Sequence, residues 1–333
     1  MRPAGLRDLD RFSAALGQDP EQVQAAGGNT SLKADGVLWV KASGLWLADA
    51  LARDIFVPVR LGRVLEGIGG GESDPVSPAV VAELNPEGLR PSIETTLHAL
   101  LPHQVVVHTQ SVRTIALAIR TDAEAQLARR LDGLDWLYVP YRKPGLPLTQ
   151  LIAQRPRERP VSIIVLGNHG LVVGAESVEA ADRLLREVER RLEAPVRAAP
   201  AGDCAALAQA AAELGLRVVK HEHAHTVATD RQQTLRATAG SLYPDHVIFL
   251  GPAVATVPGD AAGASKLFIL PGAGVLLSPD TTHSADELAL CLALVLERVP
   301  EDAAVRYLDA ADVADLLDWD AEKYRQSLAR ARR

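Results

Sequence analysis

The stretch E-A-P-V-R-A-A-P-A-G-D at 193–203 constrains the fold of this chain more than any other feature. It follows an amphipathic pattern at 178–192, in which apolar residues recur at helical spacing, and it carries two prolines and a glycine among alanines. A chain of 333 residues is also long enough for about two domains. The sequence therefore predicts a first domain at 1–192, a linker at 193–203 and a smaller domain at 204–333.

Helical and strand patterns alternate in both parts of the chain. In the first part they predict helices at 6–16, 92–101 (with Ser92 as N-cap) and 111–119, and strands at 36–41, 104–109, 161–166 and 171–174. In the second part they predict strands near 216–220, 246–250, 267–270 and 274–277, and helices near 203–214, 285–297 and 310–317. The second part is therefore predicted to be a smaller α/β domain, whereas periodicity leaves the direction of the strands in the first part open.

Charge and apolar content argue against two classes of partner. The net charge is −7, from 35 basic and 42 acidic residues, and no basic run suits a nucleic acid. No apolar run approaches the roughly 18–20 residues that cross a bilayer, and the first residues carry charges where a signal peptide needs an apolar core. Cys204 and Cys291 stand in no metal-binding or redox spacing. We therefore expect a cytoplasmic protein that binds neither nucleic acid nor a membrane.

Two loops of the first part combine glycines with small polar residues. G-G-N-T-S at 27–31 contains Asn29, and K-A-S-G at 41–44 follows a predicted strand with Ser43 and Gly44. Glycines allow tight turns whose backbone N–H groups can face an anion. Taken one at a time, both loops are more typical of ordinary turns.

The motif P-S-I-E-T-T-L-H at 91–98 begins a predicted helix. Ser92 lies where unpaired N–H groups and the helix dipole favour an anion. Glu94 is either a first-turn acid that complements the dipole or a general base. His98, four residues later, lies on the same helix face and could pair with Glu94.

Two histidines border predicted strands of the first part. V-V-V-H-T-Q-S at 105–111 places His108 and Gln110 on one face at the end of a buried strand. G-N-H-G-L at 167–171 places His169 between glycines in a loop that is predicted to be exposed, which is the stronger functional signal. Neutral imidazole is a common metal ligand, although a single histidine that ends a buried strand is more often structural.

A third histidine motif, H-E-H-A-H at 221–225, lies in the second part. If the strand at 216–220 continues, His221, His223 and His225 alternate onto one face. They would then form either a metal site or, as is more typical without a supporting acid, a solvated edge. Y-P-D-H-V at 243–247 is predicted as a turn that precedes a strand.

The order of these motifs is more specific than any one of them. G-G-N-T-S, L-W-V-K-A-S-G, P-S-I-E-T-T-L-H-A-L-L-P, V-V-H-T-Q and G-N-H-G-L together resemble the class II aldolase/adducin family over about 20–190. Within that family, the chain is most similar to the aldolase portion of the longer, two-part rhamnulose-1-phosphate aldolases. The resemblance implies an α/β fold, namely a three-layer α/β/α sandwich with a mainly antiparallel central sheet. It also implies a homo-oligomer, commonly a tetramer.

The resemblance further implies a role for each matching residue. Glu94 would be the acid/base, and His108 and His169 would be metal ligands, with Gln110 in place of the usual middle histidine. The substrate phosphate would be bound by Asn29, Ser43, Gly44 and Ser92. The implied activity is that of a metal-dependent aldolase, a lyase that cleaves a small phosphorylated ketose through an enediolate, with the metal as Lewis acid. Zn²⁺ is implied by resemblance, whereas the neutral, hard amide oxygen of Gln110 favours Mn²⁺ or Mg²⁺.

Departures from the family pattern leave alternatives open. Gln110 is compatible with a degraded metal site, and hence with a non-catalytic aldolase-like binding or scaffold protein. A metal on His221, His223 and His225 would instead make the second part the functional one. Ile93 stands where the shorter aldolases often have a second serine. The tyrosine proton donor of the family is left unassigned among Tyr138, Tyr141, Tyr243, Tyr307 and Tyr324.

Overall fold

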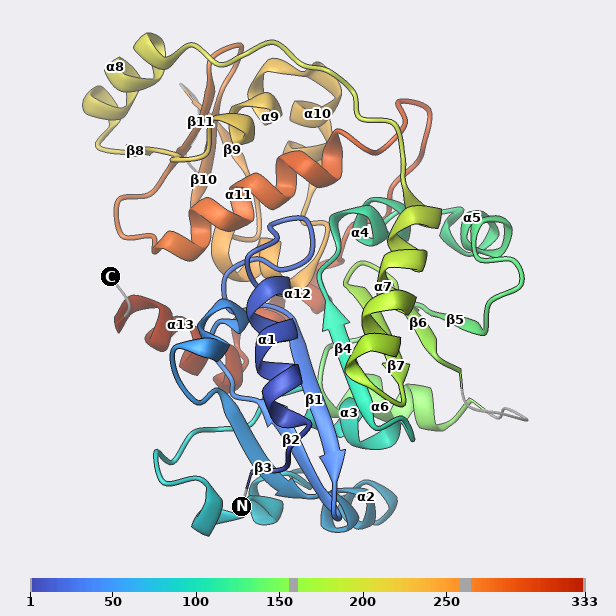
Figure 1. The fold of residues 1–333 in the computed structure, drawn as a ribbon. Helices are drawn as coiled ribbons and strands as arrows, with labels where there is room; N and C mark the ends of the chain where they lie inside the picture. The colour runs from blue at the N-terminus through green and yellow to red at the C-terminus, as the bar shows by residue number, and fades with distance from the viewer. Residues whose placement is uncertain (1, 156–160, 258–264, 332–333) are drawn as a thin grey trace. The chain divides into compact units, whose positions relative to one another are not determined.

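The computed structural model describes residues 2–155, 161–257 and 265–331 (Figure 1). In these ranges, no helix is both long enough and apolar enough to cross a membrane. The chain divides into two compact units, which are described one at a time.

The first unit contains the residues up to Ser111 and Leu127–Leu192, and it is built on a seven-stranded sheet. The strand order is β3-β2-β1-β4-β7-β6-β5, and every neighbouring pair is antiparallel except β5 and β6. This arrangement confirms the mainly antiparallel sheet. The strands are β1 (Asn29–Ala34), β2 (Val37–Lys41), β3 (Phe56–Arg60), β4 (Val105–Thr109), β5 (Trp136–Val139), β6 (Ile163–Leu166) and β7 (Gly170–Ala175).

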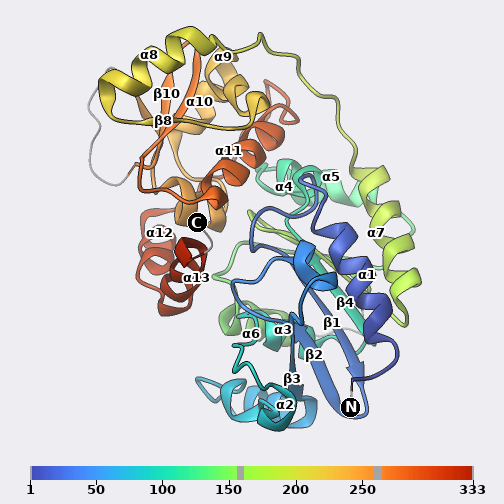
Figure 2. The ribbon, with the colours of Figure 1, turned by 60° about the vertical axis from the view of Figure 1, so that its left-hand side comes forward.

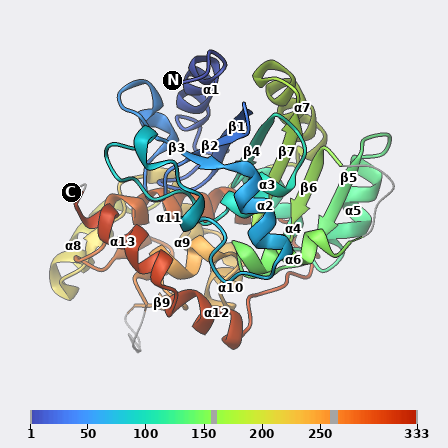
Figure 3. The same cartoon turned by 90° about the horizontal axis from the view of Figure 1, so that it is seen from below.

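Helices cover both faces of this sheet and complete the predicted three-layer sandwich (Figure 3). One face carries α1 (Leu6–Leu16) and α7 (Val178–Leu192), which pack on β1, β4 and β7. The other carries α2 (Leu61–Gly69), α3 (Thr95–Leu100) and α6 (Leu146–Ala153). Apolar side chains of α3 and α6 meet those of β4, β6 and β7 in a continuous core, whose burial drives this packing. The remaining helices of the first unit are short 3₁₀ turns at Leu47–Leu51, Ser77–Ala79 and Ala82–Leu84.

The second unit contains Val112–Gln126 and the residues from Glu193 onward. Its four-stranded sheet has the order β8 (Arg217–Val218), β11 (Gly274–Leu277), β10 (Leu267–Leu270) and β9 (Ala255–Thr256). Figure 2 labels β8 and β10 of this sheet. The helix α8 (Cys204–Leu214) packs on β8 and β11, and Asp203 caps it by accepting hydrogen bonds from two backbone N–H groups. Further α-helices in the described part of this unit are α4 (Val112–Ala118), α9 (Thr226–Thr229), α10 (Arg231–Ala239), α11 (His283–Leu296), α12 (Ala310–Leu317) and α13 (Asp320–Ala331). A smaller α/β unit is thereby confirmed.

The grouping of residues differs from the predicted domains at one place. Residues 112–126 belong to the second unit, because α4 packs against α11 of that unit. The helix α5 (Ala123–Arg130) spans the point where the chain returns to the first unit. The linker predicted at 193–203 stays a prediction.

Two predicted elements are wrong in type or in extent. The strand predicted at 246–250 is a π-helix, η5 (His246–Leu250), and all five of its residues are buried. Burial on every side removes the periodicity that distinguishes a strand from a helix. The helix predicted at 92–101 begins only at Thr95, because the backbone N–H of Ser92 is bonded to the carbonyl of Lys41 and Pro91 forms a bridge with Ala42.

Candidate active site

The middle strands of the first unit bring three of the predicted site residues to one end of the sheet. Asn29 begins β1 and lies opposite His108, near the end of β4. β7 runs antiparallel to β4, so the turn that carries His169 directly before β7 lies beside the end of β4. The strand register therefore places these residues side by side, although they are far apart in the sequence.

Glu94, His108 and His169 converge at this end of the sheet. His108 Nε2 lies 3.4 Å from Oε2 of Glu94, and His169 Nε2 lies 3.7 Å from Oε1. The two imidazole rings are 4.9 Å apart, centre to centre, at 66°. All three side chains are buried, and among the described residues they are the only group of three or more histidine, cysteine or acidic side chains that could hold a metal ion.

Hydrogen bonds fix the orientation of two of these groups. His108 Nδ1 lies 3.0 Å from the carbonyl oxygen of Leu171 and, because a carbonyl only accepts, Nδ1 carries the proton. Nε2 is the ring atom that faces Glu94, and in the neutral imidazole it carries the lone pair. Asn29 Nδ2 donates to Oε2 of Glu94 at 2.6 Å and holds the carboxylate in place. Partners of this kind orient metal-binding histidines and carboxylates in known metal sites.

The donor set fits a divalent cation. Two neutral imidazole nitrogens and one carboxylate supply N and O ligands of the type that zinc and related ions bind. Ligand atoms about 2.1 Å from a tetrahedral ion lie about 3.4 Å from one another. His108 Nε2 lies 3.4 Å from one oxygen of Glu94 and His169 Nε2 lies 3.7 Å from the other, and one ligand atom from each residue lies within 4.8 Å of the other two. The Nε2 lone pair of a neutral His108 and the buried carboxylate of Glu94 would repel each other. A proton or a metal cation between the two atoms makes this arrangement favourable.

The turn that carries His169 is buried, so the prediction of an exposed loop is wrong. Only 6% of His169 is accessible. Asn168 adopts a left-handed backbone conformation, with φ of 54°. A Cβ at Gly170 would lie 2.3 Å from the carbonyl oxygen of Thr109, and one at Gly167 would lie 2.7 Å from the hydroxyl of Tyr138. The turn is therefore packed against β4 and β5, and glycine is required where the backbones approach.

Gln110 lies against the glycine loop at 27–31. Its side chain is buried, and a Cβ built on Gly27 would lie only 1.8 Å from its Oε1. The backbone carbonyl of Gln110 accepts a hydrogen bond of 3.5 Å from Gln24. The side-chain oxygen is thus held next to the loop that begins β1. A role for Gln110 as metal ligand stays a proposal.

The segments predicted to bind an anion are joined to one another. Ser43 donates its backbone N–H to the carbonyl of Arg90 at 2.8 Å, and Ser92 donates its own to the carbonyl of Lys41 at 3.0 Å. Gly44 has a φ of 77°, which favours glycine. The loop at 42–45 and the segment that precedes α3 are therefore neighbours.

Lys41 is a residue that the sequence reasoning missed. Its side chain is 1% exposed and donates to the carbonyls of Ala26 and Leu45, at 2.8 Å and 2.7 Å. It thereby ties the loop that precedes Asn29 to the loop that contains Gly44. One feature of the sequence could have pointed to Lys41. It is the single charged residue of the otherwise apolar strand 37–41, and a lysine in such a strand is buried with it.

Two expectations for other histidines are wrong. His98 does not pair with Glu94, which precedes α3; its Nδ1 instead lies 2.7 Å from the hydroxyl of Ser31, and burial lowers its pKa to about 3. The motif at 221–225 is not a strand but the 3₁₀ helix η4 (Glu222–His225), whose side chains do not alternate between two faces.

Each imidazole of that motif has a separate partner. His221 bonds to Glu287 at 2.8 Å, His223 bonds to Glu297 at 2.6 Å, and the Nδ1 of His225 accepts from the backbone N–H of Val275 at 3.2 Å. The hypothesis of a shared metal is wrong for this motif. The solvated edge holds for His221 and His223, whose side chains are 33% and 46% exposed, but not for His225, which is buried.

The tyrosines divide between the two units. Tyr138 and Tyr141 belong to the first unit, and both border Gly167 in the turn that precedes His169. The other three belong to the second unit. Two of the five candidates therefore lie in the unit that holds the candidate site.

Fold and site together are those of an α/β domain with a candidate divalent-metal centre. The profile of the class II aldolase and adducin N-terminal domain matches residues 12–196. The chain therefore belongs to the class II aldolase and adducin family.

Similar proteins include one curated relative and several solved structures. The chain is 32% identical over 193 residues to the uncharacterized oxidoreductase YuxG of Bacillus subtilis; the match covers 53% of this chain but only 27% of YuxG. The N-terminal class II aldolase domain of a conserved protein from Thermoplasma acidophilum is 26% identical, with a TM-score of 0.48, covering 57% of this chain and 93% of that one. An L-fuculose-1-phosphate aldolase from Thermus thermophilus is 17% identical, with a TM-score of 0.40, covering 58% and 93%.

Proposed function

We infer that the chain is a metal-dependent aldolase, a carbon–carbon lyase that cleaves a small phosphorylated ketose through an enediolate. Membership of the class II aldolase family supports an aldolase-like function. The observation that carries the proposal is the convergence of Glu94, His108 and His169 in a buried group that could hold a metal ion.

In this proposal, His108 and His169 bind a divalent metal, and Gln110 takes the place of the middle histidine. The metal supplies Lewis acidity, which stabilises negative charge that develops on the substrate oxygens. Resemblance to the family favours Zn²⁺ as the bound metal, whereas the amide oxygen of Gln110 favours Mn²⁺ or Mg²⁺. The hydrogen bond from Asn29 positions the carboxylate of Glu94 to exchange a proton at the donor carbon.

The phosphate is proposed to bind at Asn29, Ser43, Gly44 and Ser92. Asn29 already gives one amide hydrogen to Glu94, so only its second hydrogen is available to a phosphate. The hydrogen bonds of Lys41 hold the two glycine loops together around this subsite. Tyr138 or Tyr141 is the proposed group that accepts the proton of the substrate hydroxyl as it becomes the aldehyde oxygen, and that donates this proton back in the reverse, condensing direction, since both border the turn of His169.

The first test measures metal content and carbon–carbon cleavage. Elemental analysis of the purified protein should find about one equivalent of a divalent metal, which His169→Ala loses. With a panel of ketose 1-phosphates, cleavage releases dihydroxyacetone phosphate. Glu94→Gln should lower turnover by at least about 100-fold and leave the fold intact, whereas Glu83→Gln, an exposed control in the same unit, should be fully active. Normal cleavage by metal-loaded Glu94→Gln would refute the mechanism.

Gln110 favours a second candidate function, a non-catalytic aldolase-like binding or scaffold protein with a degraded metal site. That hypothesis predicts that Gln110→His gains tight Zn²⁺ binding without gaining activity. A metal bound by His108 and His169 in the native protein would contradict it. A tetrameric assembly and a cytoplasmic location stay proposals that rest on the family and on composition.

A further inference from the structure

The position of Glu94 depends on two elements of the first unit, the strand β1 and the helix α3. Its carboxylate accepts the hydrogen bond from Asn29 on β1, at 2.6 Å. Its backbone carbonyl accepts a hydrogen bond from the backbone N–H of His98 in α3, at 3.1 Å. A shift of α3 along β1 would therefore move the carboxylate away from Asn29, even if the strand itself stayed in place.

A second side-chain hydrogen bond holds the same turn of α3 on β1. Ser31 Oγ lies 2.7 Å from Nδ1 of His98, and both residues are fully buried. Ser31 follows Asn29 by two residues and His98 follows Glu94 by four. These spacings return to the same face of a strand and of a helix. The two hydrogen bonds therefore lie side by side and fix one turn of α3 against the strand.

The strand β1 is a firm support for this turn. It lies between β2 and β4 in the sheet, and Ser31 is paired on both sides, with Val40 and with Val106. Sites that are built on paired strands hold their geometry better than sites on loops. The bond between His98 and Ser31 therefore fixes the turn that begins at Glu94 relative to a rigid part of the sheet.

The effect of His98 on Glu94 is geometric rather than electrostatic. Burial lowers the pKa of His98 to about 3, so its imidazole is neutral at physiological pH and adds no charge beside the carboxylate. Reaction rates in active sites depend steeply on geometry, since a misplacement of about 1 Å can cost on the order of 100-fold in rate. A small shift of this turn is therefore enough to slow proton transfer by Glu94.

We propose that Ser31 and His98 are positioning residues, which hold the carboxylate of Glu94 where it exchanges a proton at the donor carbon of the substrate. Neither residue touches the substrate, and both act through Glu94. The inference rests on the proposed aldolase function, because it deepens the role that Glu94 has there.

Steady-state kinetics with the panel of ketose 1-phosphates tests this proposal on the metal-loaded double variant Ser31→Ala/His98→Phe. Its kcat should fall at least about tenfold, while its KM stays within about twofold of the wild-type value, because phosphate binding is left intact. The second measurement is the exchange of the donor-carbon hydrogen of dihydroxyacetone phosphate with D₂O, followed by NMR. This exchange should slow by the same factor as kcat, since Glu94 moves the proton in both reactions.

The double variant is chosen so that the protein stays folded. Apolar groups replace both partners of the hydrogen bond, so no buried polar group is left unpaired and the free energy of unfolding changes little. Ser31→Ala alone strands the imidazole of His98 and should be less stable than the double variant in urea denaturation. Elemental analysis should find the same metal content in the double variant and the wild type, because His108 and His169 are unchanged.

A conservative variant separates positioning from stability. In His98→Asn, the carboxamide lies where Nδ1 lies in histidine, so it keeps the hydrogen bond to Ser31, although the lost ring volume leaves a cavity. This variant should be less stable than the double variant and yet keep about half or more of the wild-type kcat. A role in stability alone predicts the opposite order, in which kcat follows the free energy of unfolding.

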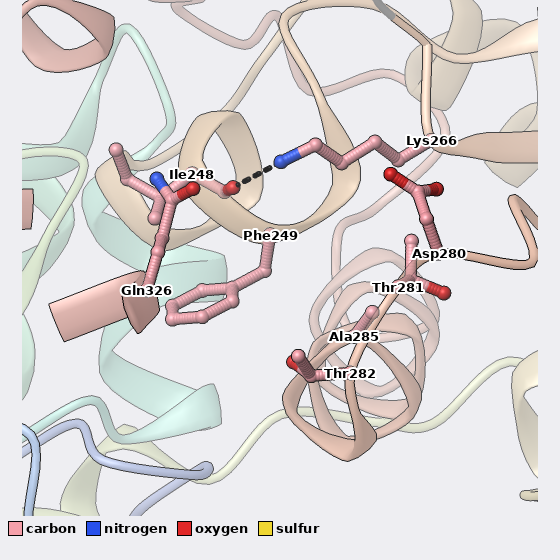
Figure 4. A pocket seen from close by; sticks show the side chains of 8 residues that line it. All are labelled: Ile248, Phe249, Lys266, Asp280, Thr281, Thr282, Ala285 and Gln326. Carbon is pink, nitrogen blue, oxygen red and sulfur yellow. Dashed lines mark hydrogen bonds between the residues drawn. The ribbon is translucent and has the colours of Figure 1, made fainter. Parts of the chain in front are cut away.

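Two controls each remove one other hydrogen bond. The hydroxyl of Thr96, in the same helix, lies 2.8 Å from that of Thr149 in α6, and Thr96→Val removes this buried contact without altering β1. In the second unit, the Nζ of Lys266 donates to the carbonyl of Ile248 at 2.9 Å, at the edge of a pocket (Figure 4), and Lys266→Met removes this bond. Both controls should keep kcat within about twofold of the wild-type value.

Three results with an active wild type would overturn this inference and leave the aldolase function standing. The double variant could keep the wild-type kcat, Thr96→Val could lose as much turnover as the double variant, or His98→Asn could be as slow as the double variant. A wild type that neither cleaves a ketose phosphate nor exchanges the donor-carbon hydrogen would instead refute the aldolase function, and this inference with it.

Discussion

Replacing Gly27 by alanine tests where the side chain of Gln110 lies. A Cβ at Gly27 would lie 1.8 Å from Oε1 of Gln110 and 2.9 Å from the carbonyl oxygen of Gln24. Contacts of a Cβ below 3.0 Å essentially do not occur, so the carboxamide of Gln110 has to move. The backbone at Gly27 does not itself oppose a side chain, because its φ is not positive.

The size of the effect follows from the burial of Gln110, of which 7% is exposed. Overpacking a filled interior costs about 1–3 kcal/mol, so Gly27→Ala should lower the free energy of unfolding by about 2 kcal/mol. In the double variant Gly27→Ala/Gln110→Ala, the contact with Gln24 remains and the contact with Oε1 is gone. The loss caused by Gly27→Ala should then shrink, with a coupling energy of about 1 kcal/mol or more.

Urea denaturation of the wild type, the two single variants and the double variant measures the four free energies of unfolding. Gly62→Ala is the matched control, since a Cβ there meets no atom within 4 Å and the residue lies in the helix α2. That control should be as stable as the wild type or slightly more stable. Strictly additive effects of Gly27→Ala and Gln110→Ala, or a Gly27→Ala variant that loses no stability, would refute the placement of Gln110.

Two further predictions concern Lys41 and His246, whose side chains are both buried. Lys41→Met should weaken the binding of inorganic phosphate at least tenfold, because the carbonyls of Ala26 and Leu45 are then no longer held together. The control is Lys33→Met. Lys33 lies at the other end of β1 and donates to the carbonyls of Leu101 and His103. This variant should bind phosphate as the wild type does in isothermal titration calorimetry. Equal losses in both variants would contradict this role of Lys41. Burial lowers the pKa of His246 from 6.5 to about 4, so between these pH values the unfolded chain binds more protons than the folded one. The free energy of unfolding should therefore fall as the pH is lowered through this window, by up to about 1.4 kcal/mol per pH unit. Urea denaturation at a series of pH values measures this fall, and His246→Gln should flatten it. An unchanged pH profile in the variant would show that His246 is not buried as a neutral group.

Most of the regular structure is predictable from local patterns. The helices α1, α7 and α12 and the strands β10 and β11 have the bounds that periodicity predicts, because each has a buried and an exposed face or is bounded by turn residues. The run at 246–250 offers no such signal, since it is apolar throughout and fully buried. The prediction for the histidine motif at 221–225 is also wrong, because β8 ends at Val218 and a 3₁₀ turn follows.

The candidate site was predictable only in part. The family motifs pointed to Glu94, His108 and His169, which the structure brings together. The bonds of Asn29 to Glu94 and of Lys41 to Ala26 were not predicted, since they depend on which strands and loops become neighbours. Residue spacing along the chain carries no information on such contacts.

By itself, the sequence determined the residues that could carry chemistry, the family to which they belong and most helix and strand positions, because these depend on residue type, order and local periodicity. Only the tertiary structure decided which of those residues act together. Antiparallel pairing of β1, β4 and β7 sets the ends of three strands side by side, and burial there orients Glu94, His108 and His169 toward one point. In the second unit, the three histidines at 221–225 do not act together, because each imidazole has a hydrogen-bond partner of its own.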